Sequence, residues 1–242
     1  VLMTFSVIAL DVVGSSTIQP IVTQAAKVFT QRTGIPISVG GGGSGFGAKS
    51  AIDGSAEIGA CSRDLKPEEV EAGLVSHTIG LDGIAIIVNG KNPLDSITSA
   101  QTVSIFRGDI TNWNSINDID DDILVISKEE GRSTGELFEK FFGIEGQAPE
   151  NAFLIGSNVE DIAFIAGDPY AIGYVSIGSA EFALARGANI KMLMLDGTTA
   201  SIQNVRNETY PLRRALNLAT MGTSTDITRQ FIEFILSEEG QG

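Results

Sequence analysis

The sequence predicts an α/β protein with mainly parallel sheets, and three observations support this prediction. Short apolar runs rich in β-branched residues alternate along the chain with segments whose apolar residues recur at helical spacing. Several predicted strands lead through Gly, Ser or Thr directly into a predicted helix, as in βαβ units. The length of 242 residues allows one large domain or two small ones, and 43% hydrophobic residues supply ample apolar surface to bury.

Three strand-to-helix junctions are expected in the first third of the chain. Their strands are short and apolar, and we place them at 7–13, 35–39 and 58–61. After the first strand, the hydroxyls of Ser15, Ser16 and Thr17 can cap a helix that ends at Gly34. After the second, a flexible elbow at 40–43 leads to Ser44 as a helix cap. After the third, Ser62-Arg63-Asp64 precede a helix that Pro67 opens.

The rest of the chain continues this alternation. An apolar strand runs on from Asp82-Gly83 and ends in a turn, and Thr98 with Gln101 forms a capping box at the start of a helix. Trp113 is expected in a surface turn, and the acidic run at 116–122 in a solvated loop. Further strands are placed at 123–126, 171–175, 192–195 and 210–220, and further helices after Ser133, at 158–166, at 179–186 and at 227–235.

Charge and composition exclude several classes of protein. Sixteen basic against 30 acidic residues give a net charge of −14, which argues against nucleic acid as the main partner. The chain is too apolar for intrinsic disorder and too interrupted by charge and Gly for a membrane span. Cys61 is the only cysteine and His77 the only histidine, so we expect no internal disulfide, no metal site and no nucleophile with its base. We therefore expect neither a cofactor nor an enzyme.

The first ten residues, VLMTFSVIAL, are apolar like the central region of a signal peptide. They lack a basic start and a cleavage site of small residues, so we interpret them as a tag remnant followed by the first strand. This interpretation says nothing against secretion, because a signal peptide is removed from the mature protein.

The segment GGGGSGFGAKS at 40–50 admits four interpretations. It could be a flexible connector, or a dinucleotide-binding loop with Asp64 downstream to meet a ribose. It nearly matches a nucleotide-binding P-loop, with Lys49 on the phosphates and Asp196 on magnesium, although Ala48 stands where that motif needs Gly. The fourth interpretation requires only a helix N-terminus, whose N–H groups and hydroxyl attract an anion.

The other junctions favour the small-anion interpretation. Ser15–Thr17 and Ser133–Thr134 repeat the hydroxyl chemistry at places that a nucleotide loop would not use. Ordinary helix capping explains each hydroxyl singly. Their combination with nearby basic residues indicates one small anion surrounded by donors, and the basic residues are Arg63, Lys128 and Arg132.

Six blocks, in order, resemble the phosphate-binding proteins of bacterial and archaeal phosphate ABC importers: GSSTIQP, GGGGSGFGAK, CSRDLKPEE, LDGIAIIVN, IFRGDITNWNSI and KEEGRST. The resemblance runs from Ala9 to the end of the chain. It implies a type II periplasmic-binding-protein fold, in which two α/β lobes are joined by two crossovers, near Gly83 and Val205, and bind one anion in a cleft. The first lobe would comprise 1–83 and 205–242, and the second 84–204.

The resemblance also implies which residues bind phosphate. In the first lobe they are Ser15, Ser16, Thr17, Gly43, Ser44, Ser62 and Arg63, and in the second Lys128, Arg132, Ser133 and Thr134. The second set departs from the family, because Lys128 stands where the family has Arg and Arg132 stands where it has Ser. Lys is a point charge, whereas Arg offers a planar fork to two oxygens. We expect Arg132 to supply the missing guanidinium rather than to turn to solvent.

A carboxylate in the cleft would distinguish phosphate from sulfate. Phosphate keeps a proton near neutral pH and can donate it to a carboxylate, whereas sulfate would be repelled and would leave the carboxylate unpaired. Asp64 is the first candidate for this acceptor, and Asp82, a turn or hinge residue, is the second.

The sequence thus predicts a protein that binds inorganic phosphate and delivers it to membrane ABC permease subunits. We expect a monomer outside the cytoplasm, in a periplasm or on the outer face of the membrane, where a lipid anchor on the full-length precursor could hold it. The lobes are expected to close on the anion about a hinge near Gly83. A phosphate sensor or scavenger of the same fold, and a P-loop nucleotide hydrolase, are the alternatives.

Overall fold

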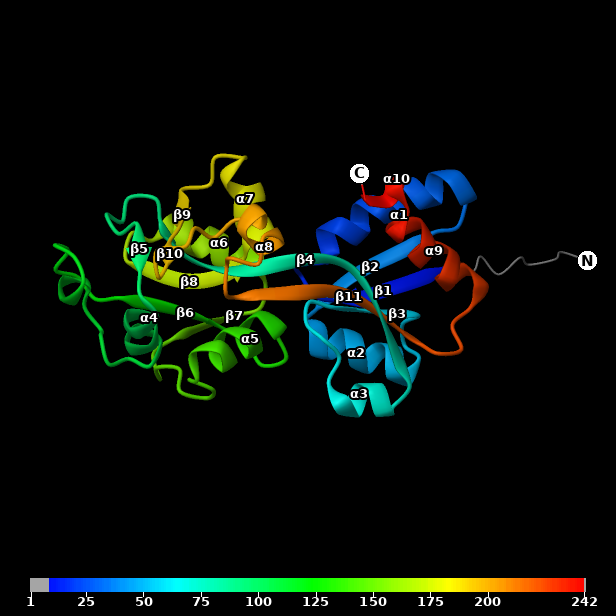
Figure 1. The fold of residues 1–242 in the computed structure, drawn as a ribbon, viewed down its shortest axis with the longest axis horizontal. Helices are drawn as coiled ribbons and strands as arrows, with labels where there is room; N and C mark the ends of the chain where they lie inside the picture. Colours follow the sequence, from blue (N-terminus) through cyan, green and yellow to red (C-terminus); the bar gives the residue numbers. More distant parts are fainter. Residues whose placement is uncertain (1–8, 242) are drawn as a thin grey trace, which may run out of the picture. The chain divides into compact units, whose positions relative to one another are not determined.

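The computed structural model describes residues 9–241, and Figure 1 shows their fold. The chain forms two compact units: the first runs to Gly80 and resumes at Ala215, and the second is Leu81–Arg214. The chain passes into the second unit within strand β4 (Leu74–Asn89) and returns within β11 (Arg213–Met221). The lobe boundaries predicted at 83/84 and 204/205 stay a prediction. The predicted strand at 7–13 and the N-terminal segment lie partly outside the described residues.

The first unit is built on a sheet with the strand order β2-β1-β3-β11. Strand β1 is parallel to both β2 and β3, whereas β11 is antiparallel to β3. The three strands that precede β4 are β1 (Leu10–Gly14), β2 (Ile37–Gly42) and β3 (Ile58–Cys61). The helices of this unit are α1 (Gln19–Thr33), α2 (Ser44–Asp53), α3 (Pro67–Glu71), α9 (Asp226–Leu236) and α10 (Glu238–Gln241).

Helices cover both faces of this sheet (Figure 1). On one face α1 and α9 share an apolar core, in which the ring of Phe29 lies 5.2 Å from that of Phe231 and 5.7 Å from that of Phe234. On the other face α2 packs against β1 and β3, and Ala48, Ala51 and other small residues make the contact. The small side chains let α2 approach the sheet closely, and this sets the position of the residues that begin the helix.

In the second unit β8 lies between β4 and β6, and β7 follows β6. Strand β8 is antiparallel to β4 and parallel to β6, and β9 pairs with β4. The strands are β6 (Leu124–Lys128), β7 (Phe153–Ile155), β8 (Ala171–Ser176) and β9 (Ile190–Met192), with a separate pair, β5 (Ser96–Ile97) and β10 (Met194–Leu195). The helices are α4 (Ser99–Phe106), α5 (Ser133–Phe142), α6 (Asn158–Gly167), α7 (Ile177–Leu184) and α8 (Ile202–Arg206).

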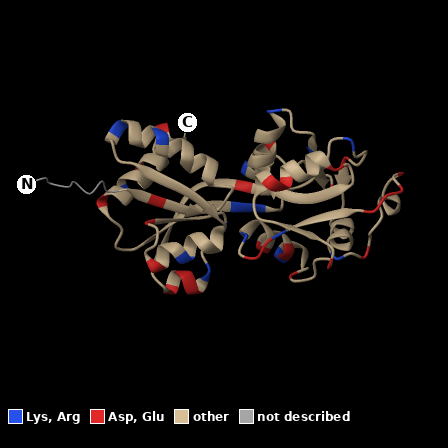
Figure 2. Cartoon of the chain, turned by 180° about the vertical axis from the view of Figure 1, so that it is seen from behind, with Lys and Arg blue, Asp and Glu red and all other residues tan. Residues whose placement is uncertain are grey.

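The predicted α/β class is confirmed, and several elements begin where their local chemistry predicts. Strand β3 has the predicted bounds, and Pro67 opens α3. Thr98 caps α4 by accepting a hydrogen bond from the Gln101 N–H at 3.1 Å. The aspartates of the run 116–122 are exposed, and Figure 2 shows acidic residues on loops and helices of both units. None of the helices at 9–241 combines the length and apolar character of a membrane-spanning segment.

Three local predictions are wrong. Gly40 to Gly42 continue strand β2 rather than forming an elbow, because β1 pairs with them in parallel. Asp82, considered as a turn or hinge residue, lies with Gly83 inside the continuous strand β4 and makes no turn. Trp113 is fully buried in a short 3-10 helix (Trp113–Ser115), where its indole N–H donates to the Tyr170 carbonyl at 2.9 Å.

Candidate functional site

Three buried serines meet in the first unit, and we call Ser15, Ser44 and Ser62 the hydroxyl cluster. Ser15 follows β1, Ser44 begins α2 and Ser62 follows β3, and each is at most 3% exposed. The Ser15 hydroxyl donates to Ser62 Oγ at 2.9 Å, and Ser44 Oγ lies 3.5 Å from the same oxygen. The Ser62 N–H donates to Ser44 Oγ at 3.1 Å. Hydroxyl protons rotate, so this cluster can turn its donors toward an anion.

Two glycines bring the cluster together. Gly14 ends β1 beside Ala60 of β3 with a φ of 136°, and a Cβ there would lie 2.3 Å from the Ala60 carbonyl oxygen. Gly43, with a φ of 90°, donates its N–H to the Gly14 carbonyl at 2.9 Å and occupies the N-cap position of α2. The prediction that Ser44 caps this helix is therefore wrong, because Ser44 is its first residue and points its hydroxyl to Ser62.

The other hydroxyl residues of the first junction lie in the turn before α1. Thr17 is buried, and its N–H donates to Ser15 Oγ at 3.2 Å, whereas Ser16 is half-buried. The predicted capping of α1 by these hydroxyls is wrong. The helix begins at Gln19 after Ile18, which makes no side-chain cap, and the Ser15 hydroxyl is used in the cluster instead.

Arg63 is buried next to the cluster, and an acidic side chain holds its guanidinium. Its Nη1 and Nη2 donate to the two carboxylate oxygens of Glu69 at 2.8 and 2.7 Å. Burial acts to raise the pKa of Glu69, but the Arg63 contact and a hydrogen bond from the Lys66 N–H hold it below its ordinary value. The Arg63 carbonyl accepts from Asn217 Nδ2 at 2.8 Å. Arg63 thus anchors the backbone that carries Ser62.

The second unit places two buried hydroxyls and a lysine at the start of α5. Ser133 and Thr134 begin this helix and are 3% and 6% exposed. Lys128, the last residue of β6, forms a buried ion pair with Asp161 of α6. Burial and the guanidinium of Arg214 lower the pKa of Lys128 to about 7. The Asp161 carboxylate favours the charged ammonium and so acts in the opposite direction.

Arg214 forms another buried ion pair in this unit. Its Nε and Nη2 donate to Asp82 Oδ2 at 3.1 and 2.8 Å, and its Nη1 donates to Thr134 Oγ1 at 2.9 Å. The Gly178 N–H, at the start of α7, donates to Asp82 Oδ1 at 3.2 Å. The side chains of Asp82 and Arg214 are both nearly inaccessible to solvent. Strand β4 contributes the negative charge of this ion pair and β11 the positive charge, beside the start of α5.

The structure separates the two candidates for the selective carboxylate. Asp64 is exposed, and Asp82 is 2% exposed. A carboxylate can discriminate between the two anions in this way only if it is buried, since water would otherwise take the place of the missing donor. Asp82 therefore has the environment that this role requires, although the sequence pattern favours Asp64.

Arg132 does not take the position expected for a compensating guanidinium. Its Nη2 pairs with Glu129 Oε2 at 3.1 Å and packs against Gly156, and its side chain is 20% exposed. The buried guanidinium that contacts a predicted ligand, Thr134, is that of Arg214.

Sequence reasoning missed Arg214 and Asp161. The first left a signal, because a charged residue in the apolar, alternating segment 213–221 is unusual for a buried strand. Asp161 left none, since an acidic residue in the first turn of a helix such as α6 is ordinary.

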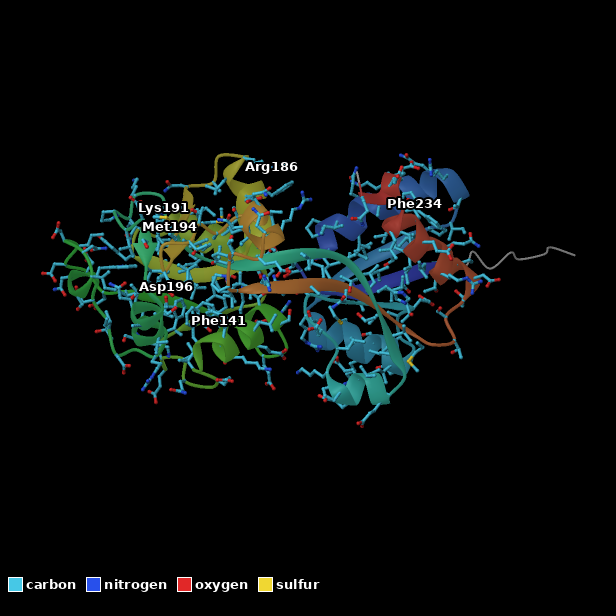
Figure 3. The ribbon with its side chains drawn as sticks, viewed as in Figure 1. Phe141, Arg186, Lys191, Met194, Asp196 and Phe234 are labelled. Atoms are coloured by element: carbon cyan, nitrogen blue, oxygen red, sulfur yellow. The ribbon has the colours of Figure 1, made fainter. Side chains whose placement is uncertain are left out.

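A P-loop does not fit this geometry. A single residue, Gly43, joins β2 to α2, and Lys49 is exposed in the second turn of α2. Asp196, labelled in Figure 3, belongs to the other unit and accepts a hydrogen bond from the Ser99 N–H at 2.9 Å. Within 9–241 no three His, Cys, Asp or Glu side chains are grouped as metal ligands.

Comparisons with known proteins agree with this architecture. Residues 6–239 match the family described as a PBP superfamily domain. The phosphate-binding protein PstS of Bacillus subtilis is 29% identical over 96% of this chain and 77% of its own length. A Clostridium perfringens protein, assigned as the substrate-binding protein of a phosphate ABC transporter and solved with bound phosphate, is 32% identical with a TM-score of 0.89 over 96% of this chain and 95% of that one. A phosphate transport receptor of Vibrio cholerae is 27% identical with a TM-score of 0.77 over the same shares of the two chains.

Proposed function

The chain belongs to the PBP superfamily, and from this membership we propose that it binds inorganic phosphate and delivers it to membrane ABC permease subunits for import. It is a binding protein and not an enzyme. One observation carries the proposal: the hydroxyl cluster of Ser15, Ser44 and Ser62 is buried, convergent and built from the ends of two parallel strands and the start of a helix. Such an array suits an oxyanion, which accepts many hydrogen bonds and offers few.

We propose that donors of both units coordinate the same phosphate. In the first unit they are the hydroxyl cluster with Ser16, Thr17 and the N–H of Gly43. Ser133, Thr134 and Lys128 supply the second set. Each hydrogen bond to a charged acceptor contributes roughly 1.5–3 kcal/mol, so a handful of them accounts for micromolar or tighter binding, about −8 kcal/mol.

Asp82 is the proposed acceptor for the phosphate proton. Its Oδ1 receives one hydrogen bond, from Gly178, and a carboxylate oxygen can accept two. A phosphate that donates to this oxygen gains a bond, whereas sulfate meets a buried negative charge. Phosphate should therefore bind far more tightly than sulfate.

We further propose that the protein works as a monomer outside the cytoplasm. This proposal is supported by the names of its relatives, which are phosphate-binding and phosphate-transport proteins. Phosphate import requires that the ligand be captured before it crosses the membrane.

Calorimetric titration with phosphate and with sulfate tests the function. We expect micromolar or tighter phosphate binding by the wild type and loss of about tenfold or more in Ser62→Ala, which removes the shared hydroxyl of the cluster. Ser55→Ala is the matched control, because Ser55 is exposed in the same unit. A wild type that does not bind phosphate, or that binds sulfate equally, would contradict the proposal.

A further inference from the structure

Strand β11 places a buried amide, that of Asn217, beside the hydroxyl cluster. Asn217 is 1% exposed and lies opposite Cys61, the last residue of β3, in the antiparallel pair of the two strands. Beyond Cys61 the chain leaves the strand, and side chains bind its backbone: Ser44 Oγ accepts from the Ser62 N–H, and Asn217 donates to the Arg63 carbonyl. Asparagine is seldom fully buried, so its presence in this strand requires an explanation.

Two hydrogen bonds fix the orientation of this amide. Asn217 Nδ2 donates to the Arg63 carbonyl at 2.8 Å, and Asn217 Oδ1 accepts from the Thr78 hydroxyl at 2.7 Å. A carbonyl oxygen can only accept, so the amide nitrogen must face Arg63 and the amide oxygen must face Thr78. Thr78 lies in β4, and Arg63 follows β3. The amide therefore ties the segment that follows β3 to both β4 and β11.

The segment that Asn217 holds carries the serine at the centre of the hydroxyl cluster. Ser62 Oγ accepts from the Ser15 hydroxyl and lies 3.5 Å from Ser44 Oγ. Glu69 holds the same segment through the long side chain of Arg63, whereas Asn217 contacts its backbone directly. A shift of about 1 Å in a binding group is enough to weaken a ligand site. The direct contact therefore controls where the Ser62 hydroxyl lies.

From these contacts we propose that Asn217 is a positioning residue of the phosphate site, which holds Ser62 where its hydroxyl meets those of Ser15 and Ser44. This inference rests on the proposed function. Asn217 acts through the Arg63 carbonyl and not by contact with the anion. An amide suits this place because it presents a donor to one neighbour and an acceptor to the other at a fixed angle.

The variant Asn217→Asp tests the donor. It keeps the size of the side chain and the acceptor for Thr78, but it places a carboxylate oxygen against the Arg63 carbonyl oxygen. At about pH 8 we expect the full chain to bind phosphate about tenfold more weakly than the wild type, because two buried acceptors face each other. Burial raises the pKa of such a carboxyl, and its protonated form can donate to the carbonyl. At about pH 5.5 the affinity should therefore return to within about threefold of the wild type.

Two further variants separate this effect from a general loss of structure. Asn217→Leu has a similar size and no hydrogen bonds, so it should bind weakly at both pH values. Gln24→Glu makes the same change of amide to carboxylate at an exposed position of α1 in the same unit, and it should bind like the wild type at both. Calorimetry gives the ratio of the dissociation constants of variant and wild type at each pH, which cancels the titration of phosphate itself.

The outcomes are separable. If the wild type binds no phosphate, the proposed function fails, and the inference fails with it. If the wild type binds phosphate and a folded Asn217→Asp binds within threefold of it at about pH 8, or stays weak at about pH 5.5, the inference alone is overturned. Circular dichroism and thermal melting report folding. A lower melting temperature with unchanged affinity would show that Asn217 serves only the stability of the fold.

Thr78 provides a second test should Asn217→Asp not fold. Its side chain is exposed, so substitutions there leave the core unchanged. Thr78→Val removes the hydroxyl that donates to Asn217 and keeps the shape, whereas Thr78→Ser keeps the hydroxyl. We expect phosphate to bind at least threefold more weakly to Thr78→Val and within twofold of the wild type to Thr78→Ser. Equal binding by the two variants would overturn the inference.

Discussion

At the scale of single residues, the Lys128–Asp161 pair determines how binding responds to pH. Burial, Arg214 and Arg132 lower the pKa of Lys128 to about 7, whereas the ion pair with Asp161 favours the charged ammonium. Removing the carboxylate should therefore lower this pKa further, so that Lys128 loses its proton at a lower pH than in the wild type.

We predict that Asp161→Asn shifts the pH dependence of phosphate binding to lower pH. Near pH 8.5 the variant should bind at least as well as the wild type, because Lys128 is mostly neutral in both and a negative charge is gone. Near pH 6.5 it should bind about threefold more weakly or worse, because neutral Lys128 offers a weaker hydrogen bond than the ammonium that the wild type keeps. Calorimetry at each pH gives the ratio of the two dissociation constants, which cancels the titration of phosphate itself. A ratio that stays constant would refute the idea, and Asp118→Asn, in the exposed loop, is the control.

A second prediction concerns Glu69 and the stability of the fold. Its pKa is lowered in the folded protein, so its stabilising effect is present above its unfolded pKa and is lost as the pH falls through the folded one. Glu69→Gln should cost roughly 2–3 kcal/mol near pH 7, because Arg63 is left buried without its partner. The difference from the wild type should shrink below about pH 4. Urea unfolding near pH 7 and below pH 4 measures the free energy of unfolding of the variant and the wild type, with the exposed Glu68→Gln as the control. If Glu69→Gln lost the same free energy at both pH values, the ion pair would not be responsible for the loss.

The candidate site could be predicted from sequence only where local chemistry marks it. Ser15, Ser44 and Ser62 of the first unit stand at strand-to-helix junctions, and such junctions converge on one edge of a parallel sheet. Arg214 and Asp161 depend on partners far along the chain, Asp82 and Lys128, and no local pattern encodes those contacts. The choice between Asp64 and Asp82 likewise depended on burial, which spacing does not give.

At the scale of elements, α2 is held against its sheet by glycine. A Cβ on Gly47 would lie 2.7 Å from the Val13 carbonyl oxygen and 2.9 Å from that of Ala60, and one on Gly59 would lie 2.3 Å from the Gly47 carbonyl oxygen. Backbone therefore packs on backbone, and this contact places Ser44 at the hydroxyl cluster.

Gly47→Ala should push α2 away from β1 and β3. We predict a loss of about 1–3 kcal/mol in the free energy of unfolding and weaker phosphate binding, since Ser44 moves with the helix. Thermal melting and calorimetry measure the two effects. Gly167→Ala is the control, because open space surrounds that position. A variant as stable as the wild type would show that the contact is not tight.

Elements with strong local signals were predicted well. Pro67 opens α3, and the Thr98–Gln101 box opens α4. The failures have tertiary causes. Gly40 to Gly42 are poor strand formers in isolation, but the ladder with β1 holds them extended. Gly83, in β4, is needed because a Cβ there would lie 2.6 Å from the Ile177 side chain and 2.9 Å from that of Val205. The sequence alone does not distinguish a glycine that turns the chain from one that makes room for neighbouring side chains.

At the scale of the whole molecule, the net charge of −14 has little bearing on phosphate binding. The buried cations of the candidate site are each paired with a carboxylate: Arg63 with Glu69, Lys128 with Asp161 and Arg214 with Asp82. What remains to attract the ligand is mostly neutral hydroxyl and N–H dipoles, which added salt screens weakly.

We therefore predict a small salt dependence. The dissociation constant for phosphate should change less than about threefold between roughly 50 and 500 mM sodium chloride. Titrations at constant pH and temperature check this, and the chloride can be replaced by another monovalent anion to exclude competition. A change of tenfold or more would mean that unpaired charge dominates binding.

The division of the chain into units also sets the order in which the protein can be completed during synthesis. Leu81–Arg214 is continuous, so all of its residues are synthesised before Ala215 is added. The first unit can be completed only after β11 and α9 are synthesised, because β11 pairs with β3 and α9 packs on α1 through Phe29 and Phe231. Until those last residues arrive, the face of α1 that carries Phe29 and the free edge of β3 are exposed. The hydroxyl cluster therefore belongs to the unit that is completed last, although its three serines are synthesised before any residue of Leu81–Arg214.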